Sequence, residues 1–322
     1  MIKQGAVRLS KRWIYFLVFV FIIVLIVILW KEDVDDKPKI VVVLKELDNN
    51  PYWYIVKAGA EKAFDDLNID GIVFAPSNEY KIDEQENLLQ SLLKQNPDAL
   101  IVSPIEESII SQLKKFNKKN IPVLLIDTDD PWENKTSYIG TNNFDLGKLG
   151  GALLGTQLQP GDKVALITGD IEQAVIGDRI IGAKTSLEAA GITTILKTDV
   201  PNNPLQAKRE METLLDKHPD INGVYATTDI LAIASHEIII KNGYNIPIVG
   251  ADGIVEMIKL IEDETLLGTV AQNPYDMGYL SVETAVRAIK GENVEMYVDS
   301  GVDIIVKGNA THRKDFIKKI LR

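Results

Sequence analysis

The sequence predicts an α/β protein with two lobes, each a doubly wound parallel sheet, preceded by one N-terminal transmembrane helix. Short runs of aliphatic and β-branched residues alternate with longer amphipathic stretches, which is the order expected of strands covered by helices. Because these runs are continuously apolar, their strands should be buried on both faces, as in a parallel sheet. One apolar stretch near the start is long enough to span a bilayer.

That stretch runs from Trp13 to Trp30 without a charge. At ~1.5 Å per residue it would form a helix of about 27 Å, close to the hydrocarbon thickness of a membrane. A basic tail, 1–12, precedes it and an acidic linker, 31–37, follows, so the positive-inside rule predicts a cytoplasmic N-terminus and extracellular lobes. No small-x-small exit follows, so we expect a retained single span in the cell membrane; a cleaved signal peptide and a buried core helix are the alternatives.

Nine strands are expected in the remainder of the chain. They are IVVVL at Ile40, GIVFA at Gly71, ALIVS at Ala99, PVLLID at Pro122, KVALIT at Lys163, ITTIL at Ile192, GVYAT at Gly223, IPIVGAD at Ile246 and LLGTVAQ at Leu266. Helices are expected at 51–67, 83–95, 107–119, 144–158, 176–190, 204–217, 230–242 and 275–290. Several of these stretches end at asparagine or glycine, which is typical of helix C-termini.

Composition and motifs exclude several classes of protein. The net charge of −11 argues against a nucleic-acid partner, and a chain without cysteine has no disulfide and no thiolate metal site. A near match to a phosphate-binding loop at Gly177 carries an extra residue, and the acidic loop after Asp127 lacks the glycine of a calcium hand. GKLGG at Gly147 is expected inside a helix, where small residues permit close packing. With three scattered histidines and no nucleophile elbow, we expect no cofactor, no metal and no enzyme activity.

Polar side chains follow the carboxyl ends of the expected strands. The segments are KELDNNPYW, DTDDPW, TTD, ADG and AQNPYD. Ligands of open parallel sheets bind at this edge, so these residues should meet around one site. Aromatic faces from Tyr52 and Trp53, ringed by carboxylates and amides, suit an uncharged polyol.

Seven motifs occur in an order that resembles a known family. They are NPYW at Asn50, IPVLLID at Ile121, IGTNNFDLGKLGG at Ile139, DRIIGAK at Asp178, GVYATTDILAIA at Gly223, IVGADG at Ile248 and VAQNPYDMG at Val270. From about residue 39 to residue 307 the chain resembles the type I periplasmic sugar-binding proteins, the ribose-binding-protein family, whose fold has two lobes.

The resemblance implies a monosaccharide held between the lobes. Tyr52 and Trp53 would stack on the sugar ring. The implied polar partners are Asn50 and Asp127 from the first lobe, Arg179, Asn202 or Asn203, Thr228 or Asp229, and Asp252 from the second, Gln272 at the hinge, and Lys45 as a further candidate. Thr128 stands where the family often has an arginine, and PNNP around residue 202 replaces a phenylalanine, so both departures argue against ribose itself.

The resemblance also implies discontinuous lobes. The first would comprise 38–141 and 273–299, the second 142–272 and 300–310, and a basic tail, 311–322, would follow. Chain crossings near Thr141, Gln272 and Ser300 would form the hinge on which the lobes close.

Two functions fit such a protein. A binding lobe fixed by its own span resembles the membrane-anchored xylose-binding sensors of Gram-positive bacteria, and this favours a pentose sensor, xylose first, that signals to the extracellular domain of a histidine kinase. The alternative is a receptor that delivers sugar to the permease of an ABC transporter. A glycoside-processing enzyme would need a paired-carboxylate cleft and is the least favoured class.

Overall fold

The fold is described from a computed structural model. It describes residues 13, 19–22, 37–47, 51–169, 171, 173–197 and 203–321. The chain divides into two compact units, Met1–Lys37 and Pro38–Arg322. The predicted span from Trp13 to Trp30 lies mostly outside the described residues, and among those that are described no helix is both long enough and apolar enough to cross a membrane.

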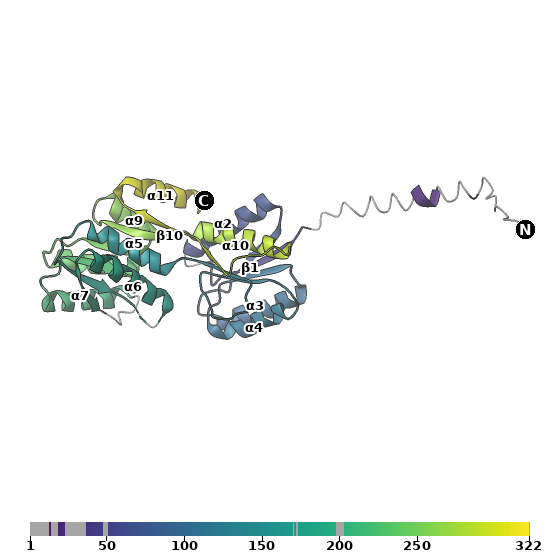
Figure 1. The fold of residues 1–322 in the computed structure, drawn as a ribbon, viewed down its shortest axis with the longest axis horizontal. Helices are drawn as coiled ribbons and strands as arrows, with labels where there is room; N and C mark the ends of the chain where they lie inside the picture. Colours follow the sequence, from purple (N-terminus) through teal and green to yellow (C-terminus); the bar gives the residue numbers. More distant parts are fainter. Residues whose placement is uncertain are drawn as a thin grey trace, which may run out of the picture. The chain divides into compact units, whose positions relative to one another are not determined.

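Within Pro38–Arg322, the first lobe is a six-stranded sheet in the order β11-β5-β4-β3-β1-β2, with every pair parallel (Figure 1). Its strands are β1 (Lys39–Val43), β2 (Asp70–Phe74), β3 (Ala99–Val102), β4 (Val123–Ile126), β5 (Ser137–Gly140) and β11 (Tyr297–Asp299). Its helices are α2 (Pro51–Leu67), α3 (Ile82–Gln95), α4 (Ile110–Asn117), which follows the 3-10 turn η1 (Glu107–Ile109), and α10 (Pro274–Ile289).

The alternation of side chains along β1 explains how helices cover both faces of this sheet. Ile40 and Val42 are buried in an apolar cluster with residues of α2 and α10. Val41 and Val43 point the other way, into a cluster with residues of α3 and α4. A strand buried on both sides must be apolar at every position, which is the pattern in the sequence.

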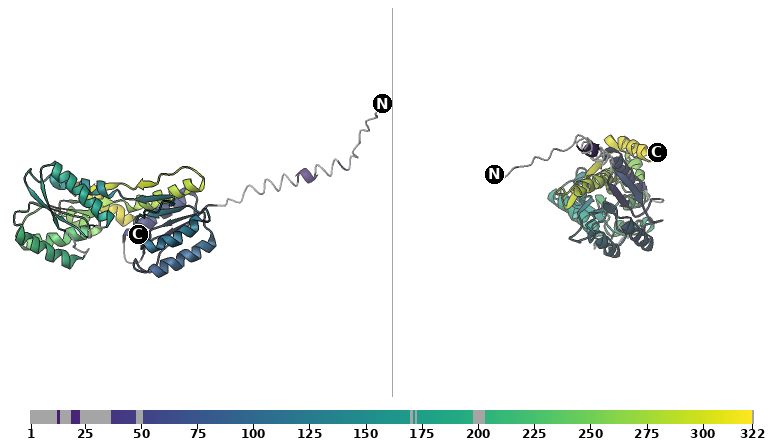
Figure 2. Two further views of the ribbon diagram at one scale, coloured as in Figure 1. Left: turned by 60° about the horizontal axis from the view of Figure 1, so that its bottom comes forward. Right: turned by 90° about the vertical axis from the view of Figure 1, so that its right-hand side faces the viewer.

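The second lobe, mainly teal and green in the left view of Figure 2, is also built on a six-stranded sheet. Its strand order is β12-β10-β9-β8-β6-β7, and it is parallel except for β12 against β10. Its strands are β6 (Lys163–Ile167), β7 (Thr193–Lys197), β8 (Gly223–Ala226), β9 (Ile248–Asp252), β10 (Gly268–Gln272) and β12 (Val302–Ile305). Its helices are α5 (Asn143–Gly155), α6 (Ala174–Ala189), α7 (Pro204–Lys217), α8 (Asp229–Lys241), α9 (Val255–Glu262) and α11 (Lys307–Ile320). The two-lobed α/β fold is therefore confirmed.

All nine expected strands and all eight expected helices are present, with small shifts at their ends. The sequence did not predict β5, β11, β12, α9 or α11. The predicted basic tail, 311–322, needs correction, because residues 311–320 belong to α11. Ile317 of that helix is 4% exposed and packs into the core of the second lobe.

Gly147 and Gly151 of α5 pack against α6, as the sequence predicted for GKLGG, and Gly150 packs against Tyr225 of β8. A Cβ atom on Gly147 would lie 2.0 Å from the carbonyl oxygen of Arg179, and one on Gly182 would lie 2.1 Å from that of Phe144. Only glycine allows the two helix backbones to approach this closely. This contact holds the backbone of Arg179 directly against α5.

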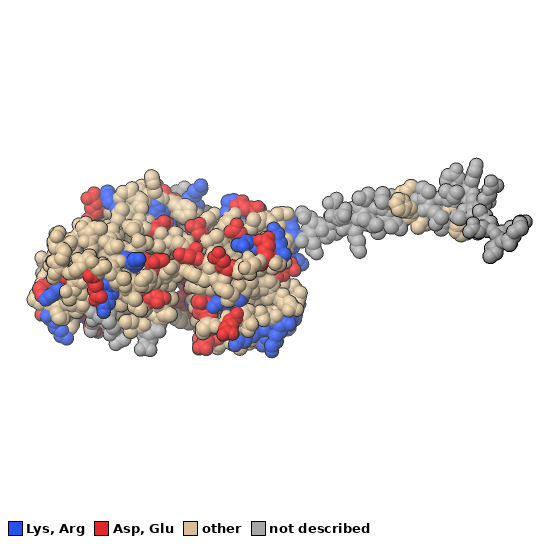
Figure 3. Space-filling view, in the orientation of Figure 1, with Lys and Arg blue, Asp and Glu red and all other residues tan. Residues whose placement is uncertain are grey.

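The surface of Pro38–Arg322 mixes both signs of charge. Figure 3 shows acidic and basic side chains interspersed over the face that it presents. With a net charge of −11, this face offers no basic stripe of the kind that follows a phosphate backbone.

Candidate functional site

A cavity of about 680 Å³ lies at the carboxyl ends of the strands and is lined by both lobes. Four of the sequence-predicted residues line it: Lys45, Asp127, Arg179 and Gln272. Its other lining residues are Thr128, Asp129, Tyr138, Thr141, Asn142, Asn143, Gln173, Ala174, Val175, Asp178 and Tyr297. Polar side chains dominate this wall, so the cavity suits a ligand rich in hydroxyl groups.

In the first lobe, Lys45 lies beyond the end of β1 and Asp127 directly follows β4, two strands that are separated in the sheet by β3. The Lys45 ammonium donates to Thr128 Oγ1 at 2.7 Å and lies 3.8 Å from Asp127 Oδ2. It also lies 5.9 Å from the centre of the Trp53 ring. The sequence places threonine after Asp127 where the resemblance implies an arginine, and the structure places the ammonium of Lys45 beside that threonine.

Asp127 is held in an uncommon backbone conformation. Its φ is +65°, in the left-handed region that few residues other than glycine adopt. Its amide donates to the carbonyl of Ile139 at 2.9 Å, and its own carbonyl accepts from the Tyr138 hydroxyl at 3.0 Å. Such conformations persist where the surroundings fix them, and here they turn the carboxylate towards the cavity wall.

Tyr52 and Trp53 lie behind this carboxylate and do not line the cavity. The Tyr52 hydroxyl donates to Asp127 Oδ1 at 2.7 Å, and its ring meets Trp53 edge-on at 5.1 Å. Burial, with the adjacent charge of Asp127, raises the pKa of Tyr52 well above its usual value, so the phenol remains a donor. Trp53 is 3% exposed within the first core. Stacking of these two rings on a sugar therefore stays a prediction.

In the second lobe, Arg179 anchors a buried polar network. It is 3% exposed, and its Nη1 donates to Asp252 Oδ1 and to the Thr227 carbonyl, both at 2.8 Å. Its Nε donates to Asn143 Oδ1 at 2.9 Å. Burial is the largest single effect and would lower the pKa of the guanidinium. The charge of Asp252, its hydrogen bond and the nearby Tyr225 and Tyr52 together outweigh burial, so the pKa is raised and Arg179 stays charged.

Gln272 joins this network to the crossing between the lobes. Its Nε2 donates to Asp252 Oδ1 at 2.8 Å, and its Oε1 accepts from Thr141 Oγ1 at 2.9 Å. Thr141 lies between β5 and Asn142, the N-cap of α5, so the Gln272 amide connects two chain crossings and the second-lobe carboxylate. The structure thus brings Arg179, Asp252 and Gln272 together, and their contact with a ligand stays a prediction.

Thr228 and Asp229 have local structural partners. Thr228 is the N-cap of α8, where its side chain accepts from the Leu231 amide. Asp229 is fully buried and accepts from Gly253 N at 2.7 Å, Ile254 N at 2.9 Å and Thr269 Oγ1 at 2.6 Å. Neither lines the cavity, so the structure gives no support for Asp229 as a ligand partner.

Two predicted residues, Asn50 and Asn202, lie outside the described residues. The alternative to the second, Asn203, caps α7 by accepting from the amides of Leu205 and Gln206 at 3.0 and 3.2 Å.

Several lining residues were not predicted. Asn143 stands within the IGTNNFD motif and could have been found there. Tyr297, which stacks on Tyr138 with ring centres 5.6 Å apart, carries no such signal because its strand, β11, was not predicted.

The acidic loop after Asp127 is held by protein partners. Asp129 pairs with Lys135 at 2.6 Å, and Asp130 Oδ1 accepts from the Trp132 amide at 2.8 Å. In the part of the chain that the structure describes, no three histidine, aspartate or glutamate side chains gather as a metal site would require.

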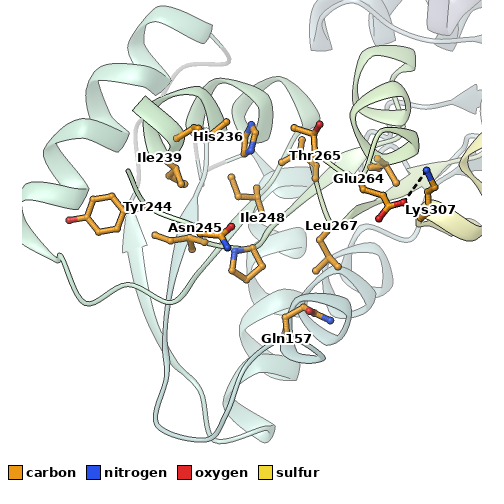
Figure 4. Close-up of a pocket in the computed structure, with 15 residues that line it drawn as sticks. Gln157, His236, Ile239, Tyr244, Asn245, Ile248, Glu264, Thr265, Leu267 and Lys307 are labelled. Atoms are coloured by element: carbon orange, nitrogen blue, oxygen red, sulfur yellow. Dashed lines mark ion pairs between the residues drawn. The ribbon is translucent and has the colours of Figure 1, made fainter. Parts of the chain in front are cut away.

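A second cavity, of about 640 Å³, lies at the opposite ends of the second-lobe strands (Figure 4). It is lined by residues that precede or begin β9 and β10, among them Ile248 and Leu267, and by His236 and Tyr244. None of the predicted site residues lines it. Of these two cavities, the first lies at the carboxyl ends of the strands, where the site was predicted.

The fold and this interlobe site define a two-lobed binding protein for small polar molecules. The chain belongs to the periplasmic binding protein domain family, whose sequence pattern matches residues 40–293. As a member of a family of binding proteins, it is not an enzyme.

Two binding proteins are similar to this chain over most of its length. The ribose import binding protein RbsB of Bacillus subtilis is 27% identical over 253 residues, which are 78% of this chain and 82% of that protein. The D-allose-binding periplasmic protein of Escherichia coli is 26% identical over 265 residues, which are 79% of this chain and 85% of that protein.

Solved structures agree with the fold. The glucose-galactose binding protein GanP of Geobacillus stearothermophilus is 29% identical, with a TM-score of 0.73 over 85% of this chain and 99% of that one. A periplasmic ribose ABC transporter structure from Conexibacter woesei, at 19% identity, has a TM-score of 0.80 over 87% of this chain and 95% of that one, which supports the fold alone.

Proposed function

We propose that the protein is an extracytoplasmic solute-binding receptor that closes on a monosaccharide and delivers it to the permease of an ABC-type importer. The observation that carries this proposal is that charged groups of both lobes line one cavity: Lys45 and Asp127 from the first lobe, and Arg179, which pairs with Asp252, from the second. A sugar has hydroxyl groups on all sides that can bond both pairs at once. Binding would then favour the closed arrangement, because only there are both pairs within reach.

The comparisons favour import over sensing. The curated relative from Bacillus subtilis is named as an import binding protein for ribose, and GanP as a binding protein for glucose and galactose. These names widen the range of sugars to be tested beyond the xylose that the sequence favoured. We therefore choose five sugars for the binding test: ribose, xylose, allose, glucose and galactose.

Sensing through a histidine kinase stays a second candidate because of one sequence feature. The uncharged stretch from Trp13 to Trp30 would hold the receptor beside a membrane partner if it is retained. An anchored receptor could serve either a kinase or a permease. The stretch therefore supports an anchor and keeps the sensor as a candidate, but it does not choose between the two partners.

The binding proposal is tested by titrating the full chain, in detergent, with the five sugars in a calorimeter. We expect one sugar to bind with 1:1 stoichiometry and Lys45→Met to weaken it about tenfold, the effect of losing one charge-assisted hydrogen bond. Lys307→Met is the matched control, since this lysine lines the second cavity and pairs with Glu264 at 3.3 Å (Figure 4). If none of the sugars binds, the proposal fails.

The choice between import and sensing is tested in cells that lack the gene. Loss of uptake of the labelled sugar identifies a transport receptor. Normal uptake with loss of the transcriptional response to that sugar identifies a sensor. Immunoblotting of membranes for an uncleaved N-terminus tests the anchor independently of both.

A further inference from the structure

The C-terminal helix α11 touches the hinge from the side opposite the sugar site. β10 of the second sheet ends at Gln272 and α10 of the first lobe begins at Pro274, so the chain crosses between lobes at Asn273. The Gln272 side chain faces the site network, as described above. Its backbone carbonyl accepts from Arg313 Nη2 of α11 at 2.6 Å.

Arg313 also bonds the side chain at that crossing and one on β12. Its Nη1 donates to Asn273 Oδ1 at 3.0 Å and to Asp303 Oδ2 at 3.2 Å. Asp303 lies on β12, directly after another crossing, at which Asp299 Oδ1 accepts from Asn142 N at 3.1 Å and Gly301 N at 3.0 Å. One guanidinium therefore joins two of the crossing segments, and its planar fork matches such multiple acceptors.

The side chain of Arg313 is mostly buried and lies beside a cavity. Its side chain is 14% exposed, and its Nε is buried without a hydrogen-bond partner among the described residues. A cavity of about 340 Å³ adjoins it, lined from α2 by Ile55, from α10 by Tyr275 and from α11 by Phe316. Space behind a crossing allows the segment to move, and the bonds of Arg313 to Gln272 and Asn273 oppose that movement.

We propose that Arg313 is a positioning residue for the sugar site, which fixes the Gln272–Asn273 crossing and thereby sets the balance between open and closed lobes. This inference rests on the proposed sugar-binding function. Without the guanidinium, the crossing has more arrangements available, and a smaller fraction of molecules has Gln272 placed to meet the ligand. Apparent affinity falls in proportion to that fraction.

The test measures the lobes directly. Because the chain has no cysteine, Lys94→Cys on α3 and Arg209→Cys on α7 place one spin label on the exposed surface of each lobe. In the sugar-free full chain we expect Arg313→Met to broaden the label distance distribution. We expect about a tenfold loss of sugar affinity, and Arg313→Lys to restore part of both.

Lys314→Met is the matched control. This neighbouring lysine pairs with Glu262 within the second lobe, and none of its described contacts reaches the crossing. It should leave both the distances and the affinity unchanged.

An unchanged distance distribution in Arg313→Met and Arg313→Lys overturns the proposal, whatever happens to affinity. If Arg313→Met does not fold, the distance measurement on Arg313→Lys decides alone. If the unaltered protein binds no sugar, the proposed function fails, while the label distances still decide the role of Arg313.

Discussion

The guanidinium of Arg179 lies 2.8 Å from Asp252 Oδ1, the same oxygen that accepts from Gln272 at 2.8 Å. A buried charge pair is thereby joined to the amide at the chain crossing. Arg179 and Gln272, the two side chains that bond Asp252, both line the cavity. Removing either charge should therefore affect both folding and binding.

Arg179→Met should lower the free energy of unfolding by about 3 kcal/mol, because Asp252 would be left as an uncompensated, largely buried charge. Sugar affinity should fall at least a hundredfold. Arg179→Lys should be intermediate, since one ammonium cannot match the fork that reaches Asn143, Thr227 and Asp252. Denaturant unfolding and calorimetry measure these effects, with exposed Arg209→Met as the control. Wild-type affinity in Arg179→Met would contradict the assigned site.

Tyr52→Phe should cost about 2 kcal/mol of stability, the usual effect of removing a hydrogen bond to a charged group. It should also weaken sugar binding severalfold, because Asp127 loses the donor that orients Oδ1. Tyr80→Phe, at a residue 80% exposed, is the control and should change nothing. Since the pKa of Tyr52 is raised, its phenol should not ionise near the usual pH of about 10, and an absorbance titration compared with Tyr52→Phe measures this. A phenolate signal from Tyr52 at pH 10 would refute the described burial.

Gly147→Ala should destabilise the second lobe by about 2 kcal/mol, because its Cβ would lie 2.0 Å from the backbone oxygen of Arg179 and the helices must separate. The same shift moves Arg179, so affinity should fall as well. Gly308→Ala in α11, where a Cβ meets no atom within 4 Å, should leave affinity unchanged and stabilise the helix by up to about 1 kcal/mol. Thermal unfolding and calorimetry distinguish the two variants. Equal behaviour of both would show that the α5–α6 approach does not place the arginine.

Asp229→Asn should change the pH dependence of stability without changing sugar affinity. Burial, with the negative charge of Asp252, raises the pKa of Asp229 well above its usual value. The folded state then binds this proton more tightly than the unfolded state. Its stabilising contribution is full below the unfolded pKa of about 3.9 and is lost as pH rises through the raised folded value.

The asparagine variant should not show that decline in the unfolding free energy. Asp229→Ala should cost about 3 kcal/mol at acidic pH, and less as pH rises through the folded pKa, because two backbone amides and the Thr269 hydroxyl lose their acceptor. Identical pH profiles for the wild type and Asp229→Asn would show that the aspartate titrates normally.

The core strands could be predicted because each carries a continuous apolar run, such as IVVVL at Ile40. The missed strands lack that run. β11 and β12 are short edge strands in which every residue but Ile305 is exposed or half-exposed, and each carries an aspartate, Asp299 in YVD and Asp303 in VDII. α11 was missed because its buried face is small: Ala310 and Ile317 are its buried residues within a lysine-rich segment.

The sequence predicts the strand ends at which the site lies, but it does not predict the direction in which the side chains at those ends point. Asp127 directly follows β4 and Asp229 comes shortly after β8, yet Asp127 lines the cavity while Asp229 is fully buried under three donors. The difference comes from the backbone. Asp127 has φ at +65°, which turns its side chain outward, whereas Asp229 begins a helix and points under it. Sequence spacing does not encode that difference.

The order of strands in the first sheet also bears on how the protein is made. β5 gains its outer neighbour, β11, and α2 gains its companion helix, α10, only from residues near the end of the chain. During synthesis the nascent first lobe therefore lacks one edge and part of its apolar cover, and it cannot complete its core until translation has passed residue 299. Such late completion favours a polypeptide that is still extended when it meets a translocation channel, and that folds on the far side of the membrane.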